Sequence, residues 1–192
     1  MNFFFVHDFR RRHRFFSSDP LELPQVKMSK TRAVWDMAKT KVIRLLPRML
    51  RQEQAFERGG RDAAETIRIL HSGRMDEKKM RKHFHVFLRQ QRSRHVAVLA
   101  GEALLVPISV LAAVLPGPNV FFYFLAVLMI IQWEALRGMA RLVRKEHEFE
   151  STPLLSEWEA AVASGDETLY PGILARIEQA FGLKDIRRIL WK

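Results

Sequence analysis

The sequence predicts an all-α fold that is organised around a membrane helical hairpin at residues 95–136. Three observations lead to this prediction. The stretch is mostly apolar, and its only formal charges are Glu102 and Glu134. A turn broken by prolines divides it and consists of Pro116, Gly117, Pro118 and Asn119. Basic residues stand on both sides of it, and helical patterns precede and follow it.

The two halves of this hairpin differ in length. Residues 95–115 would form a helix about 31 Å long, which matches the hydrocarbon core of a bilayer. Residues 120–133 would reach only about 21 Å. The two prolines between them remove backbone donors and push the preceding residues away from helical geometry. The sequence therefore leaves open a full span, a re-entrant loop, or a buried helical hairpin of a soluble protein.

Positive charges flank the hairpin and predict its orientation. The flanking basic residues, which we expect to face lipid headgroups, are Arg89, Arg92, Arg94, Arg137, Arg141, Arg144 and Lys145. Because Lys and Arg near membrane segments stay on the cytoplasmic side, or on the matrix side of a mitochondrion, both termini are predicted on that side.

Composition divides the chain into four segments. Residues 1–30 form a basic and aromatic N-terminal arm, which resembles either a transit peptide or an arm on a membrane surface. Residues 31–94 form a basic helical region, with amphipathic patterns and a short helix predicted at 62–70. The hairpin follows at 95–136. Residues 137–192 form a membrane-proximal helix and a small C-terminal helical module.

Start and stop signals delimit the helices of the C-terminal module. Thr152 before Pro153 predicts the start of a helix that ends at Ser164–Gly165. Pro171 predicts the start of a second helix, with Gly182 as its terminator. A final turn or two is expected at 184–191.

The charge distribution and the absence of known catalytic or nucleic-acid-binding motifs limit the functions that the sequence supports. The net charge is +11, and residues 1–94 hold 23 Lys and Arg against 10 Asp and Glu. Such a basic half beside a membrane segment favours anionic lipids as partners over nucleic acid, for which no recognition motif is present. No nucleotide loop, nucleophile triad or metalloprotease motif occurs, and there is no cysteine. The sequence therefore predicts no enzyme, no catalytic residue, no metal and no cofactor.

Glu102 is the single residue that most suggests chemistry. It lies about two turns inside the first apolar half, where an ionised carboxylate is costly unless it is protonated, paired or near an interface. We identify it as the candidate for an ion path. The alternative is an ordinary polar contact between helices.

Residues 115–142 resemble the mitochondrial K⁺/H⁺ exchange-related family or a bacterial relative. The likeness rests on the Pro-x-Pro-Asn turn at 116–119, on the aromatic residues that follow it and on a later aromatic-x-Ala-Leu-x-Gly pattern. The residues after the turn that carry it are Phe122, Tyr123, Trp133, Ala135, Leu136 and Gly138. This resemblance implies a protein of the mitochondrial inner membrane, or of a bacterial cytoplasmic membrane.

The implied function is monovalent cation (K⁺)/proton exchange, with the chain as a component or regulator. Two helices are few for a transporter, so we expect a homo-oligomer or a role in a larger membrane complex. The alternative is a structural or tethering hairpin subunit of such a complex.

Overall fold

The computed structural model describes residues 2–17, 52–53, 55–59, 66–111, 120–183 and 185–191. Side chains are described within these ranges except at 108–111, 120, 121 and 123. The predicted turn Pro116–Asn119 lies outside the described residues, and so do residues 31–51 of the predicted basic helical region.

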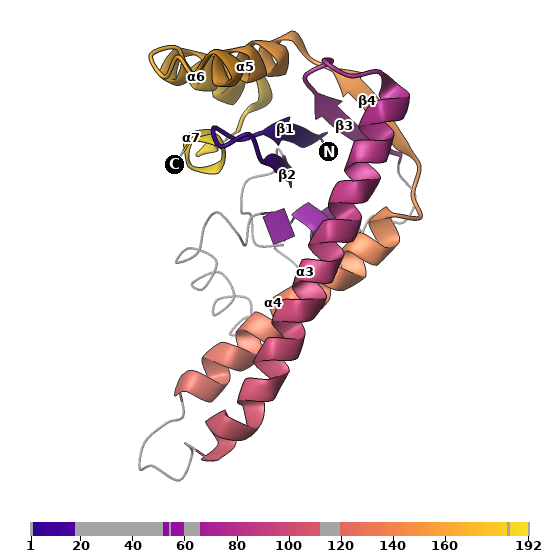
Figure 1. The fold of residues 1–192 in the computed structure, drawn as a ribbon, viewed down its shortest axis with the longest axis vertical. Coiled ribbons are helices and arrows are strands. Elements are labelled where there is room, and N and C mark those ends of the chain that lie inside the picture. The colour runs from indigo at the N-terminus through magenta and orange to yellow at the C-terminus, as the bar shows by residue number, and fades with distance from the viewer. Residues whose placement is uncertain are drawn as a thin grey trace, which may run out of the picture.

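A four-stranded mixed sheet lies at the centre of the fold (Figure 1). Its strands are β1 (Asn2–His7), β2 (His13–Ser17), β3 (Ile67–His71) and β4 (His147–Ser151), in the order β2-β1-β3-β4. β1 pairs antiparallel with β2 through a short turn, and parallel with β3, which in turn pairs parallel with β4. The strand nearest the N-terminus is therefore an inner strand of the sheet.

The residues of β1 alternate between two hydrophobic cores. Phe4 and Val6 pack with the C-terminal helices, whereas Phe3 and Phe5 pack on the other face. This alternation follows from the two-residue period of a strand. Because both faces are covered, the strand is a continuous apolar run instead of an alternating one.

Two long helices form the connection between the parallel strands β3 and β4. These helices are α3 (Glu77–Leu111) and α4 (Val120–Leu142). They pack on the sheet at one end and then extend away from it side by side as a projecting stalk (Figure 1). We define the stalk by its described residues, 96–111 of α3 and 120–133 of α4.

Three helices cover the opposite face of the sheet: α5 (Pro153–Ser164), α6 (Tyr170–Phe181) and α7 (Ile186–Leu190). Gly165 and Gly182 cap α5 and α6 with positive φ angles of 76° and 62°, which suit glycine. The predicted start of α5 at Pro153 and both predicted glycine ends are confirmed.

The predicted all-α membrane hairpin is wrong as a fold class. The N-terminal segment contributes strands β1 and β2, and residues 67–70 of the predicted helix at 62–70 belong to strand β3. Among the described residues, no helix combines the length and the apolar character needed to cross a membrane. The predicted side for the two termini depended on such a crossing and loses its basis.

Candidate functional site

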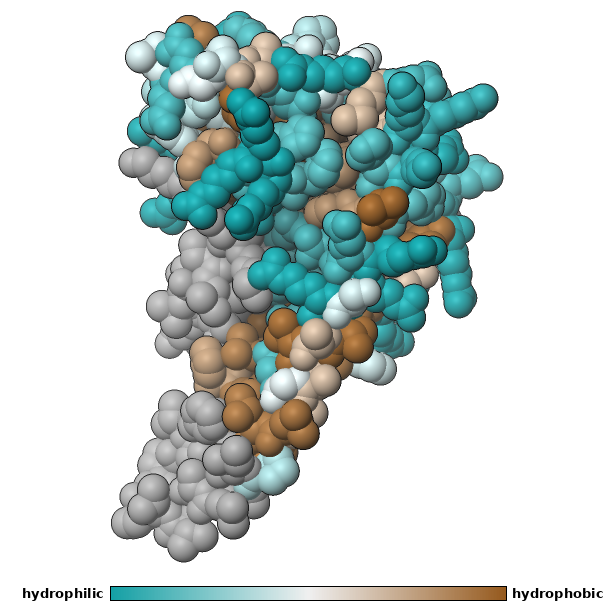
Figure 2. Space-filling view, in the orientation of Figure 1, coloured by the Kyte–Doolittle hydropathy of each residue, from teal (hydrophilic) through white to brown (hydrophobic). Residues whose placement is uncertain are grey.

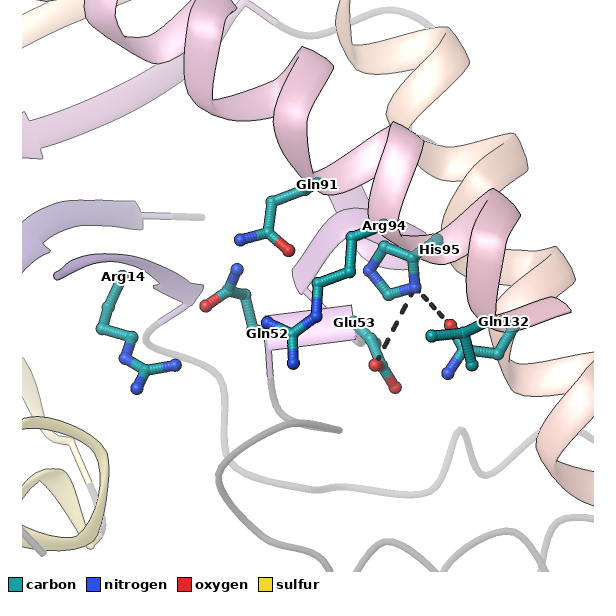
Figure 3. A pocket seen from close by; sticks show the side chains of 8 residues that line it. Arg14, Gln52, Glu53, Gln91, Arg94, His95 and Gln132 are labelled. Atoms are coloured by element: carbon teal, nitrogen blue, oxygen red, sulfur yellow. Dashed lines mark hydrogen bonds and ion pairs between the residues drawn. The ribbon is translucent and has the colours of Figure 1, made fainter. Parts of the chain in front are cut away.

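A small polar pocket lies where the stalk joins the body of the protein (Figure 3). Its volume of about 30 Å³ leaves room for a water molecule or an ion of similar size. Strand β2, a short helical segment near residue 53, and helices α3 and α4 supply its walls. The lining residues are Arg14, Gln52, Glu53, Gln91, Arg94, His95, Val98 and Gln132.

Glu53 is the buried acid of this pocket. Its side chain is only 2% exposed, and Oε1 lies 3.9 Å from Nδ1 of His95. Its second oxygen, Oε2, is buried and has no hydrogen-bond partner among the described residues. Burial raises the pKa of Glu53 to about 8; the Arg94 charge opposes this shift and the Glu102 charge adds to it. At neutral pH the carboxyl is therefore mostly protonated, because its ionised form has lost water without gaining a full set of partners.

His95 links the two stalk helices at the same place. Its Nδ1 forms a buried hydrogen bond with Oε1 of Gln132, which joins α3 to α4. With the amide oxygen as acceptor, Nδ1 carries the hydrogen and donates it. Burial lowers the pKa of His95; the Gln132 hydrogen bond raises it, and the nearby Arg94 charge lowers it further. A neutral imidazole beside a protonated Glu53 is the arrangement that these shifts favour.

Glu102 stands two helical turns beyond His95, on the same side of α3. It is half-buried, and its Oε2 is buried without a hydrogen-bond partner. Burial raises its pKa. The structure thus places the predicted ion-path candidate near the Glu53 pocket, where its charge affects Glu53, although Glu102 does not line the cavity.

The predicted basic residues gather at the base of the stalk. Their exposed members are Arg89, Arg92 and Arg94 on α3, and Arg137, Arg141 and Arg144 on or just after α4. Lys145 is less exposed, and its Nζ donates a hydrogen bond of 3.0 Å to the carbonyl oxygen of Gly59.

The residues of the family pattern occupy different environments. Ala135 is buried and Leu136 is partly buried against the core, whereas Phe122 is half-buried and Trp133 is 54% exposed. The side chain of Tyr123 is outside the described set.

Gly138 marks a close approach between α4 and the helical residues 55–59. A Cβ atom at position 138 would lie 2.1 Å from the carbonyl oxygen of Phe56 and 2.8 Å from Cα of Glu57. Since both are backbone atoms, they cannot move away as a flexible side chain would. Glycine is therefore required here, and this contact holds the segment that carries Glu53 against α4.

A second group of titratable side chains lies between the sheet and its helices. The rings of His7 and His13 are 4.1 Å apart, and Nδ1 of His7 lies 2.9 Å from Oε1 of Glu159. Within the described part of the chain, no group of three or more His, Asp or Glu side chains could hold a metal ion. Glu159 also accepts the backbone N–H of His7, so this cluster ties α5 to β1.

Sequence reasoning missed the central members of the pocket. Glu53 lies within a basic, helix-like stretch, and no local pattern distinguishes it from an exposed acid. Gln132 and His95 are 37 positions apart, and only the packing of α3 on α4 brings them together. Gln132 did offer one signal, since it is a polar residue that interrupts a long apolar run.

Comparison with known proteins supplies the family. The sequence model of the family described as mitochondrial K⁺-H⁺ exchange-related matches residues 22–144, which is more than half of the chain. The matched range includes both stalk helices and every lining residue of the Glu53 pocket except Arg14. No curated protein and no solved structure matches the chain. The chain belongs to the mitochondrial K⁺-H⁺ exchange-related family.

Proposed function

We propose that this protein takes part in mitochondrial K⁺/H⁺ exchange as a component or regulator at the inner membrane, and that Glu53 is its proton-responsive group. The family match supports the process and the organelle. The observation that carries the proton response is the buried carboxyl of Glu53, whose Oε2 has no hydrogen-bond partner within the described part of the chain and whose pKa is raised to about 8.

The pocket couples the protonation of Glu53 to the joint between stalk and body. While Glu53 is protonated, it places no negative charge beside His95, and the His95–Gln132 hydrogen bond stays intact. When Glu53 loses its proton, a buried negative charge arises beside His95 and Arg94. That charge favours proton uptake by His95 or entry of water, and either event alters the contact between α3, α4 and the segment that carries Glu53.

The test is K⁺-driven proton flux in mitochondria that lack the protein and are supplied with the wild type or with Glu53→Gln. Glutamine imitates the protonated acid and does not ionise. We expect the wild-type rate to change between about pH 7 and pH 9, centred on the Glu53 pKa of about 8. The Glu53→Gln rate should stay at the wild-type low-pH value throughout.

Glu57→Gln is the matched control, because Glu57 is half-buried on the same segment and does not line the pocket. An unchanged pH profile in Glu53→Gln would remove the proton-responsive role from this residue. A normal flux in mitochondria without the protein would argue against any part in exchange.

The second candidate function is a structural or tethering subunit of a larger membrane complex. The apolar side chains exposed on the stalk favour it, since such surfaces mark interaction sites. This function predicts that the protein copurifies in a defined complex from mild detergent and that Glu53→Gln leaves both the complex and the flux unchanged.

A further inference from the structure

The stalk exposes only apolar residues along its described length. On α3, the exposed residues between Val96 and Pro107 are Val96, Ala97, Ala100, Gly101, Ala103, Leu104, Leu105 and Pro107. On α4, those between Phe122 and Trp133 are Phe124, Ile130 and Trp133. Leu104 is 76% exposed. In Figure 2 the surface of the body is largely hydrophilic, whereas the surface of the stalk is hydrophobic.

These exposed side chains are not confined to one face of the stalk. Leu104 and Leu105 are adjacent, so they point about 100° apart around α3, and Val96 points in a third direction. A folded protein partner would cover one face of the helix pair and leave the others to water. Hydrocarbon chains can surround all of them at once.

A collar of exposed arginine residues lies where the stalk helices enter the body. It consists of Arg89, Arg92 and Arg94 on α3 and of Arg137 on α4. Among the described stalk residues, the only acid is Glu102, which is half-buried. Glu134 directly follows the last stalk residue of α4. Positive charge immediately beside an apolar surface is complementary to the phosphate groups of anionic lipids.

We infer that the stalk is a docking surface for a membrane rich in anionic lipid, in which its apolar residues enter one leaflet and the arginine collar meets the headgroup phosphates. The exposed apolar residues from Val96 to Pro107 extend over about 17 Å of helix, which is comparable to the thickness of one leaflet, about 15 Å. The inference names the partner of the proposed function, but the surface itself is argued from the stalk and does not depend on Glu53.

Vesicle flotation of the full-length protein tests this inference. One set of vesicles consists of phosphatidylcholine alone. The other contains about one third phosphatidylglycerol, which gives the vesicle surface a negative charge. We expect binding to the anionic vesicles that falls at least about tenfold in Leu104→Glu/Leu105→Glu, since charged residues are costly in hydrocarbon. Val86→Glu is the control, because Val86 is 48% exposed on the same helix but lies near the sheet. Its binding should stay within about twofold of the wild type.

Two further measurements separate the parts of the surface. Arg89→Ala/Arg92→Ala should weaken binding to anionic vesicles and leave the weak binding to neutral ones unchanged. Trp133 fluorescence, obtained as the difference between the wild type and Trp133→Phe, should shift to the blue and be quenched by brominated lipid. Circular dichroism of each variant checks that the fold is retained.

The inference is overturned by equal vesicle binding of Leu104→Glu/Leu105→Glu and the wild type. It is also overturned by a lipid-independent dimer that these substitutions dissociate, which would assign the surface to a second copy. Failure here would leave the pH profile of Glu53→Gln untouched, so the two proposals fail separately.

Discussion

At the scale of single residues, Glu53 combines burial with few partners, whereas Asp8, which is just as buried, forms an ion pair with Arg14. The Glu53 carboxyl has one oxygen 3.9 Å from His95 and another without a hydrogen-bond partner among the described residues. Such a group destabilises the fold when it is charged and does so only weakly when it is neutral. The raised pKa of Glu53 therefore also makes the free energy of unfolding depend on pH.

The free energy of unfolding should fall with rising pH because of Glu53. Its pKa is raised from 4.5 to about 8, so between these values the unfolded chain has lost a proton that the folded chain keeps. Stability is full below about pH 4.5 and is lost until about pH 8. Between pH 6 and pH 9 the loss should be about 2–3 kcal/mol in the wild type and absent in Glu53→Gln.

Two histidines, the half-buried His13 and the buried His147, should lower the free energy of unfolding at acid pH. Burial lowers the pKa of both His13 and His147 to about 4, with neighbouring positive charges adding to the shift. Stability from these residues is present above about pH 6.5 and is lost as the pH falls towards 4. Denaturant unfolding from pH 4 to pH 9 should thus show that Glu53→Gln removes only the alkaline decline. A decline that persists in Glu53→Gln would assign it to another group.

At the scale of elements, Gly138 fixes the contact between α4 and residues 55–59. Gly138→Ala would bring its Cβ against the backbone of Phe56, so we expect a loss of about 2 kcal/mol or more in the free energy of unfolding. Gly101→Ala is the matched control, because a Cβ atom at position 101 would have no neighbouring atom within 4 Å and alanine favours helix by up to about 1 kcal/mol. Equal effects of the two substitutions in thermal unfolding would contradict the close approach.

Elements with local signals were predictable and those that depend on distant partners were not. The ends of the C-terminal helices depend on the backbone preferences of single residues, which can be read from the sequence. Pro153 begins α5, and Gly165 and Gly182 end α5 and α6. The run Phe3–Val6 is too short for the apolar core of a secretory signal, so the sequence predicts only an N-terminal arm there. It becomes a strand because β3 pairs with it, and a short apolar run alone does not reveal such a partner. The same non-local pairing explains the error at Ile67–His71.

At the scale of the whole molecule, a sheet covered by helices on both faces carries a projecting stalk (Figure 1). The sequence predicted two helices around the turn at 116–119, and α3 and α4 occupy those positions. It did not predict that they connect two parallel strands, because β3 and β4 are separated by the whole hairpin. Glu102 could be identified from its local surroundings, whereas the Glu53 pocket forms only when four segments distant in the sequence come together.

The central claim is that Glu53 holds its proton at neutral pH and releases it near pH 8. The most direct measurement is a carbon-13 NMR titration of the glutamate carboxyl groups in the labelled full-length protein, with Glu53→Gln to identify the Glu53 resonance. We predict a midpoint at about 8 for this resonance. A midpoint near the ordinary glutamate value of about 4.3 would contradict the claim and leave the pocket without a proton-responsive group.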